Sequence, residues 1–264
     1  MDFPVYINLG SWRIHPHVLF ETLSYFIGFR LYLWTRRPSG MSKLDSLLLL
    51  GGTILGAALG AKLLFWLEDP AATWEQLRQF HLLWGGKTIV GGLLGGLIGV
   101  ELTKRWIGWT RSTGDDYAYP LIAGMAIGRI GCFLTGLEDR THGTPTNWIT
   151  GVDFGDGIMR HPAQLYEFGF LILLGIALIP LYRQSRRQIA FEQQGRYISG
   201  SMFQWFMAGY LAYRFASEFI KPTPHPYFGL NNIQLACIAG LVYYALLIRK
   251  GFRLKASGQP AAPQ

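Results

Sequence analysis

Seven apolar segments, each long enough to cross a lipid bilayer, divide this chain. A helix needs about 20 consecutive apolar residues to span the hydrocarbon core. Half of the residues are hydrophobic and only 15% are charged. The pattern therefore predicts an all-α protein, a polytopic membrane helical bundle of about seven transmembrane helices. The segments lie near residues 16–36, 44–67, 84–107, 117–136, 164–182, 199–220 and 231–249.

The charges between these segments predict how the chain is oriented. Lysines and arginines gather after the first, third, fifth and last segments, as at Arg36, Arg37, Arg186 and Arg187. Because basic loops stay in the cytoplasm, we expect the N-terminus outside and the C-terminus in the cytoplasm. The net charge of +8 follows from these clusters, and we expect no nucleic acid partner.

The domain organisation is predicted to be simple. We expect one transmembrane domain over residues 1–255, with an extracytoplasmic loop at about 136–163. The polar, Pro- and Gly-containing tail at 256–264 is predicted to be disordered, and the N-terminus shows no pattern of a cleaved signal peptide. Cys132 and Cys237 lie in apolar runs, where small packing roles are expected rather than a disulfide.

Four basic residues fall within or near the edges of the apolar segments. Arg30 lies close to a segment end, where a long side chain reaches the interface. Lys62 lies about a turn from the end of its segment, within reach of Glu68 or Asp69, so a structural role is expected. Arg129 and Arg214 are harder to place, because a charge at mid-bilayer costs about 2.5–3.5 kcal/mol. Glu218, at i+4 from Arg214, could simply neutralise it. Arg129 has no acid within four residues on either side, so its partner must come from elsewhere, and an anionic ligand is one candidate.

The third segment is rich in glycine between residues 85 and 99. Small residues at i and i+4 allow two helices to approach closely in lipid. Glycine also allows a backbone to bend around a ligand. Both interpretations, close helix packing and a broken segment beside a cleft, remain open at this point.

The motif RHPAQLYE stands at the start of the fifth segment. Pro162 is suited to the start of a helix, which places Gln164, Tyr166 and Glu167 in the first turns. His161 then lies at the mouth of this helix, either as a hydrogen-bonded cap or as a functional residue. The chain shows no zinc-helix motif, phosphate loop or dinucleotide fingerprint, and no nucleophile-elbow serine.

With these motifs the chain resembles the bacterial prolipoprotein diacylglyceryl transferase family over nearly its whole length. The resemblance rests on LSYFIGFRLY in the first segment, GGKTIVGGLLGGLIGV in the third, GRIGCF in the fourth, RHPAQLYE, GYLAYRFASEFIK in the sixth and GLNNIQ before the last. The family transfers the diacylglyceryl group of phosphatidylglycerol to the thiol of a lipobox cysteine in a prolipoprotein, releasing glycerol phosphate. The resemblance implies a multi-pass transferase of lipoprotein biosynthesis in the bacterial cytoplasmic (inner) membrane, with its active site toward the outer face.

The resemblance also implies the partners of the protein. They are phosphatidylglycerol, the prolipoprotein signal peptide with its lipobox cysteine, and the surrounding membrane lipids. Neither a metal nor an organic cofactor is required by the reaction, so none is expected.

The residues of the site can be assigned through the resemblance. In the family reaction, negative charge grows on the leaving phosphate. Arg129 and Arg214 would stabilise this charge in a low-dielectric site, and Glu218 would orient Arg214. The acceptor thiol needs a base or a positive field, and His161 or Glu167 would remove its proton. The predicted substrate-binding residues are Tyr25, Arg129, Glu138, Arg140, Arg160, Gln164, Tyr166, Arg214, Glu218 and Gln234.

The sequence departs from the family pattern at several positions. Where the family usually has a histidine in the third segment, with a proton-handling role, this chain has Val90. Cys132 replaces an asparagine in the fourth segment. Thr135 and Leu137 stand where the family has an asparagine and a glutamate, with Glu138 one place along.

These departures leave alternatives open. The chain could use another base, such as His142 or His161. It could also be a non-catalytic or altered-specificity phospholipid-binding membrane protein derived from the family. A small-solute transporter is disfavoured, because the sequence shows no repeated halves with matching broken helices.

Overall fold

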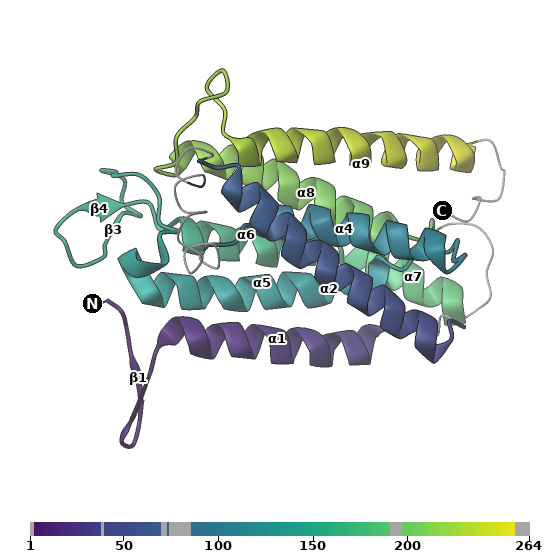
Figure 1. The fold of residues 1–264 in the computed structure, drawn as a ribbon, viewed down its shortest axis with the longest axis horizontal. Coiled ribbons are helices and arrows are strands. Elements are labelled where there is room, and N and C mark those ends of the chain that lie inside the picture. The colour runs from purple at the N-terminus through teal and green to yellow at the C-terminus, as the bar shows by residue number, and fades with distance from the viewer. Residues whose placement is uncertain (1–2, 38–39, 70–72, 74–85, 191–196, 257–264) are drawn as a thin grey trace. The chain divides into compact units, whose positions relative to one another are not determined.

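The computed structural model describes residues 3–37, 40–69, 73, 86–190 and 197–256, most of them in helices (Figure 1). The chain divides into two compact units. The first combines Met1–Arg37 with Thr113–Pro222, and the second combines Pro38–Ser112 with Thr223–Gln264. The expected disordered tail, 256–264, lies outside the described residues from position 257 onward.

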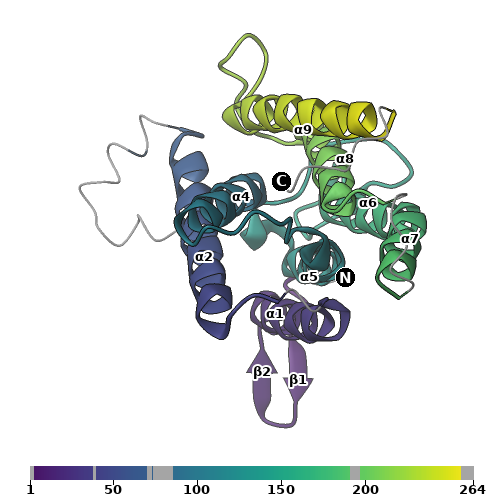
Figure 2. The same ribbon diagram turned by 90° about the vertical axis from the view of Figure 1, so that its right-hand side faces the viewer.

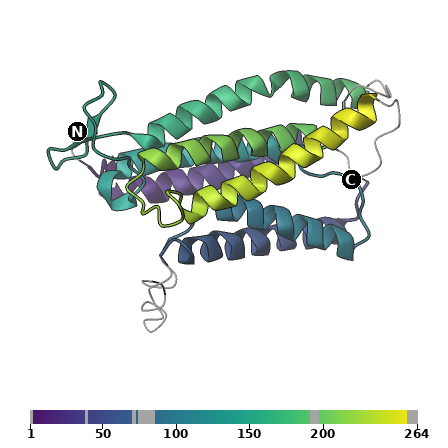
Figure 3. The ribbon, with the colours of Figure 1, turned by 90° about the horizontal axis from the view of Figure 1, so that it is seen from above.

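Five helices form most of the first unit. Helix α5 is central to it: α1 lies along one side of α5, and α6 and α8 pack against α5 and against each other (Figures 1 and 2). Helix α7 continues directly from α6, so the two form one long run (Figure 3). The bounds are α1 Pro16–Thr35, α5 Asp115–Thr135, α6 Ala163–Ala177, α7 Ile179–Ala190 and α8 Ser201–Ser217, with short 3-10 helices η2 Gly136–Asp139 and η3 Glu218–Ile220.

Two small antiparallel hairpins complete the first unit. Strands β1 (Ile7–Leu9) and β2 (Trp12–Ile14) precede α1, and β3 (Val152–Asp153) pairs with β4 (Met159–Arg160) in the long loop after α5.

Backbone hydrogen bonds fix this loop onto η3, which directly follows α8. The amide of Thr144 donates to the carbonyl of Ile220 at 2.7 Å, and the amide of Gly143 donates to the carbonyl of His161 at 2.8 Å. The end of α5, the start of α6 and the end of α8 are thereby held at one end of the unit.

The second unit contains α2 (Lys43–Trp66), α4 (Ile89–Trp106) and α9 (Asn232–Ala256). Helices α2 and α4 lie side by side (Figure 2), and glycines of the two helices face each other along their contact. A methyl group added to Gly56, Gly60, Gly91 or Gly95 would overlap the backbone of the opposite helix. Because only glycine permits this approach, the prediction of close helix packing is confirmed. The alternative of a broken segment is wrong for the described residues, since α4 runs without interruption from Ile89.

Local signals explain where these helices begin. Ser42 accepts a hydrogen bond from the amide of Asp45 at 3.1 Å, and Thr88 accepts one from the amide of Gly91 at 3.2 Å. Such caps satisfy amides that have no partner within the helix. Val90 follows the second cap in the buried first turn of α4.

The predicted apolar segments correspond closely to the helices. Within the described residues, four helical stretches have the length and composition to span a membrane: Lys43–Trp66, Asp115–Asp139, Ala163–Arg187 and Asn232–Phe252. The prediction of a helical membrane protein is therefore confirmed at this coarser level. Helix α8 has only 17 residues, and α4 carries Glu101, Lys104 and Arg105 near its end, so composition alone identifies them less readily.

Candidate active site

Two arginines and one glutamate meet inside the first unit. Arg129 comes from α5, Glu167 from the second turn of α6 and Arg214 from the last turn of α8. Arg129 Nη2 lies 2.9 Å from Glu167 Oε1, and Arg214 Nη1 lies 3.2 Å from Glu167 Oε2. The three residues are only 6%, 2% and 5% exposed, respectively. Glu167 therefore joins the two guanidinium groups that the sequence placed on separate segments.

Three further side chains surround this triad. The hydroxyl of Tyr210 donates to Glu167 Oε1 at 2.7 Å. Glu218 pairs with Arg214, as the i+4 spacing predicted, and Lys221 Nζ lies 3.3 Å from Glu218 Oε1. We call this set the arginine cluster; its members are Arg129, Glu167, Tyr210, Arg214, Glu218 and Lys221.

The arginine cluster contains more positive than negative groups. It holds three cationic side chains and two carboxylates. Burial lowers the pKa of Lys221 to about 8, and the positive charge of Arg214 adds to this effect while Glu218 opposes it. At neutral pH the cluster keeps an excess of one positive charge. A buried charge without compensation is costly, so an anion would be stabilised here.

Several buried polar atoms at this end of the unit lack a hydrogen-bond partner within the described residues. Among them are Nε of Arg129, Nε of Arg214, both amide atoms of Gln164 and the hydroxyl of Tyr213. Gln164 is only 1% exposed. Buried polar groups are nearly always paired in native structures. The two Nε atoms and Nε2 of Gln164 are donors suited to a ligand with several acceptor oxygens, and Oε1 of Gln164 can accept from a ligand hydroxyl.

His161 and Tyr166 form a separate group at the start of α6. The Nδ1 atom of His161 lies 3.1 Å from the Tyr166 hydroxyl, and this hydroxyl lies 2.6 Å from Oγ1 of Thr150. The ring of Trp148 packs edge-on against His161. His161 is thus hydrogen-bonded within the loop, an arrangement compatible with both predicted alternatives.

Other predicted site residues make their contacts outside the arginine cluster. Arg160 forms a two-pronged pair with Asp156 at 2.7 and 2.8 Å, which lowers the pKa of Asp156. Glu138 is exposed and lies 3.4 Å from His15. Tyr25, exposed on α1, donates to Glu21 at 2.9 Å. Arg140 is exposed and follows η2 with a left-handed backbone, φ 53°.

Gln234 belongs to the second unit, where it caps α9. Its Oε1 accepts from the amide of Asn231 at 2.9 Å, and Oδ1 of Asn231 accepts from the amide of Gln234 at 2.8 Å. This reciprocal pair is a helix cap, so the fully buried side chain of Gln234 has a structural role at the start of α9.

Sequence reasoning missed two members of the arginine cluster. Tyr210 lies one turn before Arg214 on α8, and Lys221 lies three residues after Glu218. Both spacings place the side chains on the face that carries Arg214. The partner of Arg129 was also incompletely predicted: a carboxylate of the protein, Glu167, lies beside it.

The fold and this site define a class of protein. It is a helical membrane protein with a buried, positively charged cluster, suited to an anionic ligand, at one end of a helix bundle. The family model described as prolipoprotein diacylglyceryl transferase matches residues 4–249. The chain belongs to this family.

Curated relatives give the same result over most of their length. A protein of Methylobacillus flagellatus is 34% identical over 88% of this chain and 88% of its own length. One from Aromatoleum aromaticum is 32% identical, with 82% of this chain and 84% of the relative covered. One from Nitrosomonas europaea is 30% identical, with 88% and 82% covered. Each of the three is named phosphatidylglycerol–prolipoprotein diacylglyceryl transferase.

Proposed function

We propose that this chain transfers the diacylglyceryl group of phosphatidylglycerol to the thiol of a lipobox cysteine in a prolipoprotein, and releases glycerol phosphate. Family membership and the names of the relatives support this reaction. The observation that carries it is the arginine cluster, where Arg129 and Arg214 meet at one carboxylate and keep unpaired Nε donors. The binding-only alternative is not favoured, since the relatives are named as transferases.

In the proposed reaction, a thiolate attacks the glycerol carbon that carries the phosphate. The carbon–oxygen bond breaks, and negative charge grows on the departing phosphate. Arg129 and Arg214 stabilise this charge, because preorganised donors act strongly in a buried, low-dielectric site. Gln164 supplies further hydrogen bonds from the same end of α6.

Glu167 acts in this scheme as a positioning residue rather than as the base. Its two carboxylate oxygens face two guanidinium groups and the Tyr210 hydroxyl. A carboxylate stabilised by so many donors accepts a further proton poorly. Glu218 orients Arg214 from the other side, while His161 is the remaining base candidate among the residues first assigned to proton removal.

We also propose the membrane placement that the sequence predicts. Helices α1, α2, α4, α5, α6 with α7, α8 and α9 would form seven spans of one transmembrane domain, with the N-terminus outside and the C-terminus in the cytoplasm. In the first unit, Arg37 donates to Ser185 at 3.1 Å, so the basic ends of α1 and α7 lie together. Basic residues favour the cytoplasmic side. The opposite end, with the arginine cluster and the loop at 136–163, would face outward in the bacterial inner membrane.

Glycerol phosphate release tests the proposed function directly. The purified protein in detergent is given phosphatidylglycerol labelled in its headgroup, with and without a lipobox peptide. We expect labelled glycerol phosphate and a lipidated peptide, both dependent on the peptide thiol. A protein that holds the lipid without product would establish the binding-only alternative, and a failure to complement a strain depleted of its own transferase would argue against this acceptor.

A further inference from the structure

Three potential metal ligands converge near the outer end of α5. They are His17 in the first turn of α1, Cys132 near the end of α5 and Asp139 at the end of η2. One ligand atom from each lies within 4.8 Å of the other two, and His17 Nδ1 is 2.9 Å from Asp139 Oδ1. Helix packing brings these residues together, because His17 and Cys132 are more than 100 positions apart in the chain.

The chemistry of the three atoms suits zinc. Zinc takes imidazole nitrogen, thiolate sulfur and carboxylate oxygen at about 2.0–2.3 Å, and its tetrahedral geometry places ligand atoms about 3.2–3.8 Å apart. Small side-chain rotations would bring the ligand atoms into this range, since His17 Nδ1 and Asp139 Oδ1 are now 2.9 Å apart and all three atoms lie within 4.8 Å of one another. Three protein ligands and one open position are typical of a catalytic rather than a structural zinc site.

The ligands have supporting partners of the kind found around metal sites. Glu21 Oε2 lies 3.4 Å from His17 Nε2, on the ring nitrogen opposite the one that faces Asp139. Tyr25 donates to the other oxygen of Glu21, and Thr141 donates to Asp139 Oδ2 at 2.6 Å. A histidine ligand commonly donates its second N–H to a carboxylate, which fixes the ring and its tautomer.

This group borders the arginine cluster. Nη1 of Arg129 lies 3.9 Å from Sγ of Cys132, while Nη2 of the same guanidinium pairs with Glu167. The side chain of His17 is 34% exposed, so the group is open on one side. A thiol held here would lie next to the guanidinium that receives the lipid phosphate.

The proposed reaction still needs a means of activating the acceptor thiol. His161 faces Tyr166, and Glu167 is occupied by two arginines. A bound zinc ion would activate the thiol directly, without a protein base, because a thiol that coordinates zinc is deprotonated.

We propose that His17, Cys132 and Asp139 bind a zinc ion whose fourth position takes the thiol of the acceptor cysteine; this inference rests on the proposed function. The acceptor thiol loses its proton to solvent on binding zinc. Its sulfur then forms a bond to the glycerol carbon, the carbon–oxygen bond breaks, and the electron pair leaves with the oxygen of glycerol phosphate. No oxidant or reductant takes part.

Metal content tests the site without reference to activity. The purified full-length protein is incubated with zinc chloride, desalted and assayed by mass spectrometry for zinc. We expect one zinc per chain, lost in His17→Ala, Cys132→Ser and Asp139→Asn. Glu21→Gln should weaken zinc binding about 10–100-fold, as expected for loss of an outer carboxylate. Cys237→Ala is the matched control, since Cys237 is buried in α9 of the other unit, and it should keep its zinc.

Cobalt substitution tests the role of the open position. The cobalt protein should show a thiolate-to-cobalt charge-transfer band that Cys132→Ser abolishes, and a lipobox peptide should add to this band whereas its serine analogue should not. Chelation of zinc should also abolish thiol transfer until zinc is returned.

The outcomes separate this inference from the proposed function. If the protein releases glycerol phosphate at full rate without zinc, the acceptor role of the zinc ion is disproved and the transferase function stands. If Cys132→Ser keeps both rate and zinc, the zinc site itself is disproved and the transferase function again stands. If zinc binds at the three residues but the peptide thiol leaves the cobalt spectrum unchanged, the acceptor role is disproved. If the zinc-loaded protein holds metal and peptide thiol but never releases glycerol phosphate, the proposed function fails alone.

Discussion

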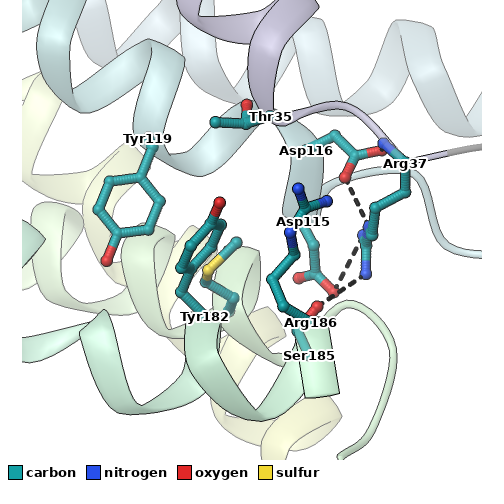
Figure 4. Close-up of a pocket in the computed structure, with 9 residues that line it drawn as sticks. Thr35, Arg37, Asp115, Asp116, Tyr119, Tyr182, Ser185 and Arg186 are labelled. Atoms are coloured by element: carbon teal, nitrogen blue, oxygen red, sulfur yellow. Dashed lines mark hydrogen bonds and ion pairs between the residues drawn. The ribbon is translucent and has the colours of Figure 1, made fainter. Parts of the chain in front are cut away.

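Two charged clusters lie near opposite ends of α5, and they differ in how completely their polar groups are paired. The arginine cluster surrounds Arg129 near the end of the helix. The second, the aspartate cluster, surrounds Asp115 at its start, about 20 Å away at 1.5 Å per residue. Its members are Arg37, Asp115, Asp116, Ser185 and Tyr197, most of which line the small pocket of Figure 4.

The aspartate cluster is closed by its own hydrogen bonds. Arg37 donates from Nε to Asp116 at 2.6 Å and from Nη1 to Ser185 at 3.1 Å. Asp115 accepts from the Tyr197 hydroxyl at 2.6 Å and from the amides of Gly200 and Phe203 at 2.7 and 3.0 Å. These bonds hold the ends of α1, α5, α7 and α8 together.

The arginine cluster differs in both charge and pairing. It has three cations for two carboxylates, and the Nε atoms of both arginines lack partners within the described residues. A fully paired polar cluster specifies and stabilises a fold, whereas an incompletely paired one is stabilised by a ligand. The comparison therefore supports the proposal that the arginine cluster binds the lipid phosphate, while the aspartate cluster has a structural role.

Removal of either buried arginine should have the largest effect. Arg129→Ala and Arg214→Ala should lower turnover about 100- to 1000-fold, the range seen when one transition-state donor is lost. Turnover is measured as glycerol phosphate release in detergent, with the folded fraction determined by size-exclusion chromatography. Arg30→Ala, an exposed arginine on α1, should retain its rate. Wild-type turnover in Arg129→Ala or Arg214→Ala would show that the replaced arginine does not stabilise the lipid phosphate.

The aspartate cluster should respond in the opposite way. Arg37→Met should destabilise the protein by about 1–3 kcal/mol, because it leaves carboxylate acceptors buried without their donor. Turnover per folded molecule should stay within about twofold of wild type, since no substrate contact is lost. Thermal unfolding in detergent measures the first effect and glycerol phosphate release the second. A large loss of turnover at unchanged stability would show that the aspartate cluster also takes part in the reaction, contrary to the proposed difference between the two ends of α5.

Replacing Gln164 should stabilise the protein and weaken its binding of lipid at the same time. Gln164→Leu removes a buried amide whose two polar atoms have no partner within the described chain, so the thermal midpoint should rise. The same change should raise KM for phosphatidylglycerol about tenfold, the effect of one or two hydrogen bonds. Gln164→Glu should weaken lipid binding further, because its charge repels the phosphate. An unchanged KM in both variants would place Gln164 outside the lipid site.

Lys221 should give the smallest effect, and it should appear as a pH dependence of stability and of phosphatidylglycerol binding. Its pKa is lowered to about 8, first by burial and then by Arg214, compared with about 10.4 for a free lysine. The folded protein therefore releases this proton before the unfolded chain does. Its contribution to the free energy of unfolding should rise between about pH 8 and 10.5.

Phosphatidylglycerol binding should show the reverse trend, since the cluster loses one positive charge. We expect affinity to fall about threefold between pH 7 and 9, the size of one partly screened ion pair. Equilibrium binding in mixed micelles measures it without the confounding ionisation of the acceptor thiol. Lys221→Arg should keep its charge and give a flat profile; the same step in this variant would assign the titration to another group.

Particular residues show how far sequence reasoning reached. The apolar runs predicted most helix ends to within a few residues, although α7 and α9 continue to Ala190 and Ala256, beyond the apolar runs. The i+4 spacing correctly paired Arg214 with Glu218. The glycines of the third segment correctly indicated close packing as one of two possibilities. In contrast, Glu167 was expected to remove a proton, and no local pattern showed that two arginines from other helices would occupy its oxygens.

The sequence by itself determined which segments are helical and apolar, because hydrophobicity and capping act over a few neighbouring residues. It also determined that two arginines lie within apolar segments and need partners. Only the tertiary structure decided what those partners are. Glu167 reaches both arginines, and His17 reaches Asp139 and Cys132, through the packing of α1, α6 and α8 around α5. Such contacts depend on how the helices rotate and pack against one another. The number of residues between two positions in the sequence does not determine that rotation.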